Sequence, residues 1–171
     1  MAKEHKPKLK LMKNIYATIR MAYFASGIRA CYKYDSRVRN IIDSLIGEGL
    51  EMCLGILPSH KAIVITKNGE DIKCKIVDNY SVTNGISLYF KNLEFALMVL
   101  NNRLSCAMAY AQGRFVLSGD TRKAVNFIHM LSIVQNYFAS DYNKKFYLKN
   151  NISNEVKSGK IKRFIYFRGW L

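Results

Sequence analysis

The dipeptide Asn68-Gly69 most tightly constrains how this chain can fold. It lies between two stretches of similar length, Lys61 to Lys67 and Asp71 to Val77, and Asn-Gly between such arms is the strongest short-range signal for a β-hairpin. In the second arm apolar residues alternate with Asp and Lys, so one face of that strand is expected in a core and the other in water. The chain therefore contains an antiparallel pair of strands.

Other segments predict further strands and several helices. Strands are expected at Leu50 to Leu57, at Ile86 to Phe90, and around Phe115 and Leu117. Helices are expected from Met12 towards Tyr32, behind the capping residues Asp35 and Ser36, from Asn92 to Leu100, from Leu104 to Ala111, and from Asp120 to about Phe138. Because strands come mostly as neighbours and helices in groups, the sequence predicts an α+β fold: one five-stranded, mostly antiparallel sheet covered by helices on one face.

The first helix and the two ends set the expected organisation. Apolar residues recur along the first helix at three- and four-residue spacing, which is typical of an amphipathic helix; they are Met12, Ile15, Ile19, Ala22 and Tyr23. We expect residues 1–49 to form a basic start and an N-terminal helical extension, residues 50–138 the main domain, and residues 139–171 a basic, aromatic tail.

Positive charge is concentrated at the ends of the chain. The 171 residues include 27 Lys plus Arg against 12 Asp plus Glu, a net charge of +15, while half of the residues are apolar. The first 13 residues hold five Lys and one Glu, and residues 138–171 hold eight basic and two acidic residues, so two thirds of the excess lies in the ends. Basic ends can simply keep a small domain soluble, or they can contact an anionic surface, either lipid or nucleic acid.

The motifs of common enzymes and metal sites are missing from the sequence. It has no Walker A loop, no G-x-G-x-x-G, no G-x-S-x-G and no H-E-x-x-H. The four Cys form no C-x-x-C pair, and Cys106, the best nucleophile candidate, is expected to pack in the core. We therefore expect no catalytic residue, metal or cofactor. Lys13, Asn14, Arg20 and Arg29 interrupt the first apolar stretch, which argues against a signal peptide or a membrane span and favours a cytoplasmic protein with reduced cysteines.

One segment carries a specific family resemblance. Gly85 to Tyr137 contains a strand, a polar cap before a Phe-containing helix, the stretch AMAYAQGRFVLSGD from Ala107 to Asp120, and a final helix with apolar residues at core spacing. This segment resembles the second half of the sterol carrier protein 2 lipid-binding domain, in its bacterial-type stand-alone form. The resemblance implies a five-stranded sheet with helices on one side that enclose an apolar tunnel for acyl, sterol or isoprenoid lipids.

The resemblance also implies which residues line that tunnel. By position they are Phe95, Met98, Gln112, Phe115, Phe127, Leu131 and Val134. The same side chains could equally form an ordinary filled core, and that alternative stays open.

The tail after Lys157 mixes basic and aromatic residues. Rings at headgroup depth with cations on lipid phosphates suit a membrane surface. The candidate membrane-surface residues are Lys160, Lys162, Arg163, Phe164, Tyr166, Arg168 and Trp170. The same mixture also suits nucleic acid, the weakest alternative, or packing of the tail on its own domain.

Two functions follow from these features. The first is a non-enzymatic lipid-binding or carrier protein that holds one apolar ligand and docks to an anionic membrane through its basic ends. The second is an interaction module with a filled core that binds a partner protein or nucleic acid through its basic surface. The apolar N-terminal helices could support a homo-oligomer as readily as a lid.

Overall fold

The computed structural model describes residues 7–46, 50–59, 61–80 and 84–138, together with residues 159, 161 and 163. Helices and strands follow one another in the order expected from the sequence. They are α1 (Pro7–Tyr34), α2 (Ser36–Leu45), β1 (Glu51–Ile56), β2 (Lys61–Asn68), β3 (Asp71–Val77), β4 (Gly85–Phe90), α3 (Leu93–Leu100), α4 (Cys106–Ala111), β5 (Phe115–Ser118) and α5 (Thr121–Phe138).

The five strands form one sheet in the order β3-β2-β1-β4-β5. Strand β1 is antiparallel to β2 and parallel to β4, and the pairs β2–β3 and β4–β5 are antiparallel. Asn68 pairs with Asp71, and Gly69 between them has φ 64°, a left-handed conformation that glycine adopts without strain. The predicted hairpin and the predicted α+β fold with a mostly antiparallel sheet are both confirmed.

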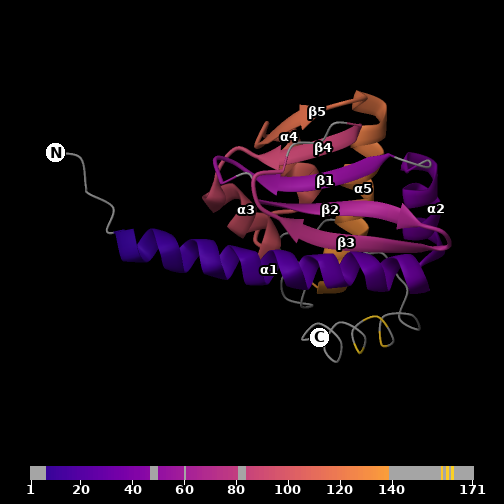
Figure 1. Cartoon of the computed structure of the whole chain (residues 1–171), viewed down its shortest axis with the longest axis horizontal. Helices are drawn as coiled ribbons and strands as arrows, with labels where there is room; N and C mark the ends of the chain where they lie inside the picture. Colours follow the sequence, from indigo (N-terminus) through magenta and orange to yellow (C-terminus); the bar gives the residue numbers. More distant parts are fainter. Residues whose placement is uncertain are drawn as a thin grey trace.

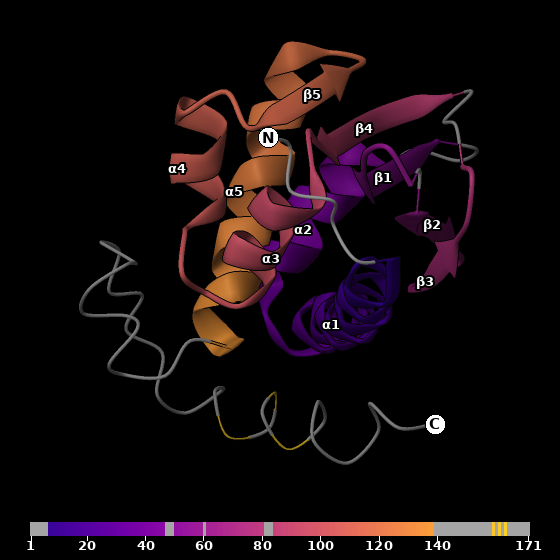
Figure 2. The same cartoon turned by 90° about the vertical axis from the view of Figure 1, so that its left-hand side faces the viewer.

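The helices α2 to α5 lie on one face of the sheet, which we call the inner face (Figures 1 and 2). Alternate residues of the central strands point into this side because side chains along a strand alternate between faces. In β1 they are Met52, Leu54 and Ile56, and in β4 they are Ile86, Leu88 and Phe90, all buried. Helix α5 packs its Phe127 and Leu131 against them, and neither side chain is accessible to solvent.

Helix α1 runs along the β3 edge of the sheet, and its N-terminal end extends past the sheet (Figure 1). It contacts β3, α2, α3 and α5, and buried residues of both α1 and α2 belong to the same apolar core as the sheet. The packing side of α1 is a row of mostly small and flexible residues: Ala17, Met21, Phe24, Ala25 and Ile28.

The apolar spacing that predicted the first helix marks its solvent side instead. Met12, Ile15 and Ile19 are 66%, 53% and 59% exposed, and Leu11 and Tyr16 beside them are also exposed. We call these five residues the α1 stripe. The helix itself is confirmed. Both of its faces carry apolar residues, but only the face with Ala17, Met21 and Ile28 packs on the rest of the domain, and the α1 stripe faces solvent.

The opposite, outer face of the sheet is covered at its centre by two tyrosines. The Tyr89 ring lies over Gly55 of the neighbouring strand, where a Cβ would come within 2.2 Å of its Cε1 atom. The Tyr89 hydroxyl donates to the Tyr80 carbonyl over 2.6 Å and accepts from the Cys53 thiol, and Tyr80 donates to the Glu51 carboxylate. Cys53 is therefore fully buried although it lies on the outer face.

Candidate functional site

Six of the seven residues predicted to line a lipid tunnel form two groups. Phe115, Phe127, Leu131 and Val134 are buried in the apolar core between the helices and the inner face. Phe95 of α3 is half-buried and packs against this core, and Met98 is half-buried on the same helix. The structure thus brings six of the seven residues to one region and arranges them from surface to interior.

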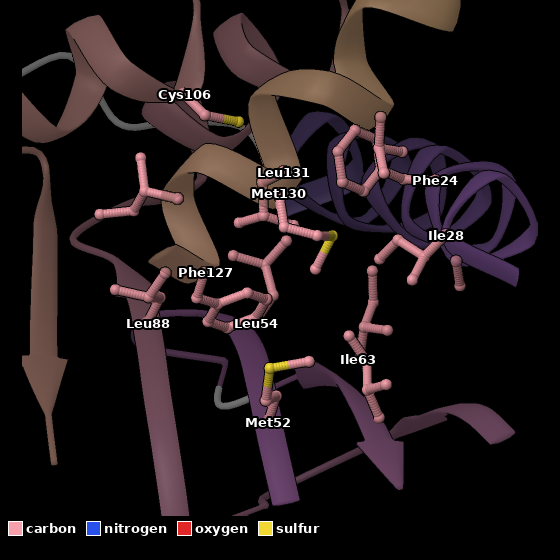
Figure 3. Close-up of a cluster of buried hydrophobic side chains, with 14 of the residues drawn as sticks. Phe24, Ile28, Met52, Leu54, Ile63, Leu88, Cys106, Phe127, Met130 and Leu131 are labelled. Carbon is pink, nitrogen blue, oxygen red and sulfur yellow. The ribbon is translucent and has the colours of Figure 1, made fainter. Parts of the chain in front are cut away.

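The interior group is tightly packed. Phe127 and Leu131 of α5 point towards Leu54 and Leu88 of the sheet (Figure 3), and the rings of Phe90 and Phe115 have centroids 4.4 Å apart. All of these side chains belong to the same cluster of buried apolar residues.

The edge group is held in place by the start of α3 and by one cation. The Asn92 side chain accepts a hydrogen bond from the Phe95 backbone N–H over 2.9 Å, which caps the helix. The Arg114 guanidinium lies 4.5 Å from the centre of the Phe95 ring, and its Nη1 is 3.2 Å from the Met98 sulfur. We call Phe95, Met98 and Arg114 the α3 rim. Phe95 packs against the core, so apolar surface continues from the rim inward.

Gln112 lies apart from the other six. It is the C-cap of α4, its backbone N–H donates to Met108 over 3.0 Å, and its side chain is exposed. The buried glutamine is Gln135 of α5, which is inaccessible to solvent. Its amide donates to the carbonyls of Val99 and Leu104 over 2.9 and 2.8 Å and accepts from the Cys106 N–H over 3.0 Å.

Gln135 therefore fixes the turn between α3 and α4 beside the core. The family resemblance indicated Gln112, not Gln135, as the glutamine of the site. The sequence signal was a glutamine among the buried apolar residues of the last helix, because a buried amide must have hydrogen-bond partners.

The predicted membrane-surface residues lie mainly outside the described residues, namely Lys160, Lys162, Phe164, Tyr166, Arg168 and Trp170. Of the described tail residues, Arg163 is exposed, whereas Ile161 is fully buried and belongs to the core cluster. The burial of Ile161 agrees with the alternative in which part of the tail packs on its own domain.

The α1 stripe is the largest group of exposed apolar side chains among the described residues. Next to it, three polar contacts join α1 to α3 and the turn after it. Lys13 pairs with Glu94 at 2.6 Å, the Tyr16 hydroxyl donates to Asn101 over 2.9 Å, and Arg20 donates to the Leu100 carbonyl over 2.5 Å. The stripe is thus presented by a helix that is fixed to the body of the domain.

Comparison with solved structures gives partial likenesses of low sequence identity. A structure described as UbiJ-SCP2 ubiquinone synthesis protein has 10% identity and a TM-score of 0.42, with 64% of this chain and 94% of that chain covered. Sterol carrier protein 2 like 2 from Aedes aegypti has 14% identity and a TM-score of 0.32, with 58% and 94% covered. The chain is similar to sterol carrier protein 2-like domains.

A third likeness is to a double mutant of the sec-alkyl sulfatase PisA1, with 16% identity and a TM-score of 0.37 over 53% of this chain. This chain spans about 14% of the length of that sulfatase. No protein-family model and no curated protein matches the chain.

The best nucleophile candidate, Cys106, is buried. Burial raises the pKa of the Cys106 thiol to about 12, so it stays protonated at neutral pH and is a poor nucleophile. Among the described residues, no group of three or more His, Cys, Asp and Glu side chains could hold a metal ion. No described helix is long and apolar enough to cross a membrane.

A polar cleft of about 510 Å³ lies at the far end of α1, beside α2 and the β2–β3 hairpin. Asp43 is hydrogen-bonded there by Tyr32 over 3.0 Å and by Lys67 over 2.8 Å. Arg39 donates to the carbonyls of Tyr32 and Lys33 at the C-terminal end of α1. Asp43 and Lys67 thus pair with each other, and Arg39 binds the C-terminal end of α1. We therefore assign these three side chains a structural role.

Proposed function

We propose that this protein is a non-enzymatic lipid-binding or carrier protein that holds an apolar chain between the helices and the inner face of the sheet. The observation that carries the proposal is the continuity of apolar surface from the half-buried Phe95 of the α3 rim to the core that contains Phe115, Phe127 and Leu131. The resemblance of Ala107 to Asp120 to the sterol carrier motif supports the same assignment. Removing a chain from water contributes about 0.8 kcal/mol for each buried CH₂ group.

The packed interior dictates how such a ligand would be held. Because protein interiors are close-packed, the chain must take the place of side chains that move aside. Met52 and Met130 lie among the buried residues of Figure 3, and the unbranched thioether of methionine adapts to neighbours of different shape. We expect the bound and empty forms to differ in the packing of α3 and α5 rather than in the order of the sheet.

The α1 stripe and the basic ends support docking at an anionic bilayer surface. Exposed Met12, Ile15 and Ile19 continue a segment in which five of the first 13 residues are Lys. Apolar side chains inserted at headgroup depth and lysines beside anionic phosphates are the two contributions that hold a helix at an interface. A peripheral location on a cytoplasmic membrane surface, with exchange of the ligand there, follows from this proposal.

The test is native mass spectrometry of the full chain purified from its own cells, followed by extraction and identification of any bound lipid. The proposal predicts one lipid for each chain, retained through mild desalting. A lipid-free mass, together with no uptake from vesicles of mixed phospholipids that contain a labelled fatty acid, would overturn it.

One observation favours a second candidate function. Phe127, Leu131 and Val134 are all inaccessible to solvent, as in a core that is simply filled. On this alternative the domain is an interaction module that binds a partner protein or nucleic acid through its basic surface. Binding to single-stranded nucleic acid that weakens steeply with salt, without lipid uptake, is the result it predicts.

A further inference from the structure

The guanidinium of Arg114 is a positioned cation at the α3 rim, at the edge of the apolar core. Its backbone is fixed on both sides, since its N–H donates to the Ala109 carbonyl over 2.9 Å and its carbonyl accepts from the Lys91 N–H over 3.0 Å. The preceding Gly113 has φ 64°, which turns the chain out of α4 and aims residue 114 at α3. The side chain then lies across Phe95 and Met98.

This cation has apolar neighbours and lacks an acidic partner. Within the described parts of the chain, no carboxylate lies within ion-pair distance of Arg114, and the nearby acid of α3, Glu94, is paired with Lys13. A guanidinium presents five N–H donors, and a thioether sulfur is only a weak acceptor. Apart from the contact with the Met98 sulfur, the N–H donors of this partly exposed guanidinium have no acceptor among the described residues, so they are available to an acceptor from outside.

We propose that Arg114 binds the anionic head group of an amphiphilic ligand, a carboxylate or a phosphate, whose apolar chain runs past Phe95 and Met98 into the core. The inference rests on the proposed lipid-binding function and adds the class of ligand to it. Two parallel N–H···O bonds from one guanidinium suit both oxyanions. Phe95 beneath the guanidinium then serves as the first apolar contact of the chain.

The test compares ligands that differ only in the charge of the head. The fluorescent cis-parinaric acid and its methyl ester are titrated into the full chain at pH 8, and hexadecyl phosphate and hexadecanol compete for the bound probe. The acid is expected to bind at least about tenfold more tightly than the ester, the size of a charge-assisted hydrogen-bonded contact. Two affinity ratios are then compared: that of hexadecyl phosphate to hexadecanol, and that of the acid to its methyl ester. The larger ratio shows which oxyanion the site prefers.

Two variants assign the preference to Arg114. Arg114→Gln is expected to bring acid and ester to within about twofold of each other, while affinity for the ester changes little. Arg114→Lys keeps a positive charge without the planar fork and should retain part of the preference. Arg122→Gln removes one charge from the exposed start of α5 and serves as the matched control, which should keep the full preference.

The outcomes separate this inference from the function it rests on. Equal binding of acid and ester by the unaltered chain, or an undiminished preference in Arg114→Gln, overturns the role of Arg114 but leaves lipid binding intact. If neither the acid nor the ester binds, the proposed function fails as well. Should Arg114→Gln not fold, the comparison of Arg114→Lys with Arg122→Gln still decides, because a reduced preference in the first variant and the full preference in the second is the expected result.

Discussion

Tyr137, near the end of α5, donates a hydrogen bond of 2.7 Å to Asp35, the residue that caps α2. The Asp35 side chain is only 3% exposed and also receives the Arg37 backbone N–H over 2.9 Å and the Arg37 Nη2 over 2.7 Å. One buried carboxylate, at the junction between α1 and α2, therefore joins α2 to α5. The N-terminal helices are fixed to the last helix by this contact as well as by the apolar core.

Tyr137→Phe removes that hydrogen bond without removing the ring. We expect the free energy of unfolding to fall by about 1–2 kcal/mol at pH 7, because a hydrogen bond to a charged acceptor is stronger than one between neutral groups. Urea denaturation followed by circular dichroism measures the change. Tyr110→Phe, a half-buried tyrosine of α4, is the matched control and should change stability by less than about 0.5 kcal/mol.

The same carboxylate makes stability depend on pH. Burial raises the pKa of Asp35, but hydrogen bonds from Arg37 and Tyr137 outweigh this effect, so its pKa lies below the ordinary value. A carboxyl group whose pKa is lower in the folded state stabilises the fold above its unfolded pKa, and this contribution disappears as the pH falls through the folded pKa. The stability of the unaltered chain should therefore decline between about pH 5 and pH 2.

Asp35→Asn tests this assignment, because an amide has no charge to lose. The variant should be less stable than the unaltered chain at pH 7, and the difference should shrink as the pH falls below about 4. A difference that stays constant between pH 7 and pH 2 would show that Asp35 is not the group that titrates. Urea midpoints measured at a series of pH values give the comparison.

Gln135 is predicted to matter for stability where Gln112 does not. Gln135→Leu leaves the Cys106 N–H and the carbonyls of Val99 and Leu104 without their partner, which should cost about 2–4 kcal/mol. Gln112→Leu alters an exposed side chain and should change stability by less than about 0.5 kcal/mol. Gln112→Leu also tests the prediction that Gln112 lines the tunnel. If it does, this variant should bind cis-parinaric acid with a different affinity from the unaltered chain.

The α1 stripe should bind membranes without supporting the fold. Replacing Ile15 and Ile19 together by Ser should leave the free energy of unfolding almost unchanged, since both are more than half exposed. Sedimentation with phosphatidylcholine vesicles that contain about 30% phosphatidylserine should fall at least about tenfold. Val125→Ser, on the exposed side of α5, is the control and should sediment like the unaltered chain. If the double variant sediments normally but loses self-association in analytical ultracentrifugation, the stripe binds a second copy instead.

Local patterns in the sequence predicted the elements well because each has a local cause. Asp35 and Asn92 cap their helices through side-chain bonds to nearby backbone N–H groups, and Asn68-Gly69 forms the turn of the hairpin. Which face of a helix packs on the sheet depends instead on elements that are distant in the sequence. The spacing of Met12, Ile15 and Ile19 is as regular as that of the residues that pack, so periodicity predicted the helix but not its orientation.

The sequence likewise predicted the part of the site that depends on local structure, but not the contacts between distant elements. The motif placed Phe115, Phe127 and Leu131 in one region, since a strand and a helix joined by a short turn fold onto each other. It could not reveal that Arg114 crosses to Phe95 and Met98, or that Gln135 rather than Gln112 is the buried amide. These contacts join residues 16 to 36 positions apart and depend on how α3, α4 and α5 pack together.

The cover over the outer face gives a last prediction, because it depends on the absence of a side chain at Gly55. A Cβ at this position would overlap the Tyr89 ring, so Gly55→Ala should displace the ring and cost about 1–3 kcal/mol. In a Tyr89→Ala background the same change should cost far less, since the ring that it meets is gone. A double-mutant cycle on urea unfolding measures this coupling, and additive effects would show that Gly55 is not required for the Tyr89 contact. Displacement of the ring should also expose Cys53, which is read out as faster reaction of its thiol with a disulfide reagent than in the unaltered chain.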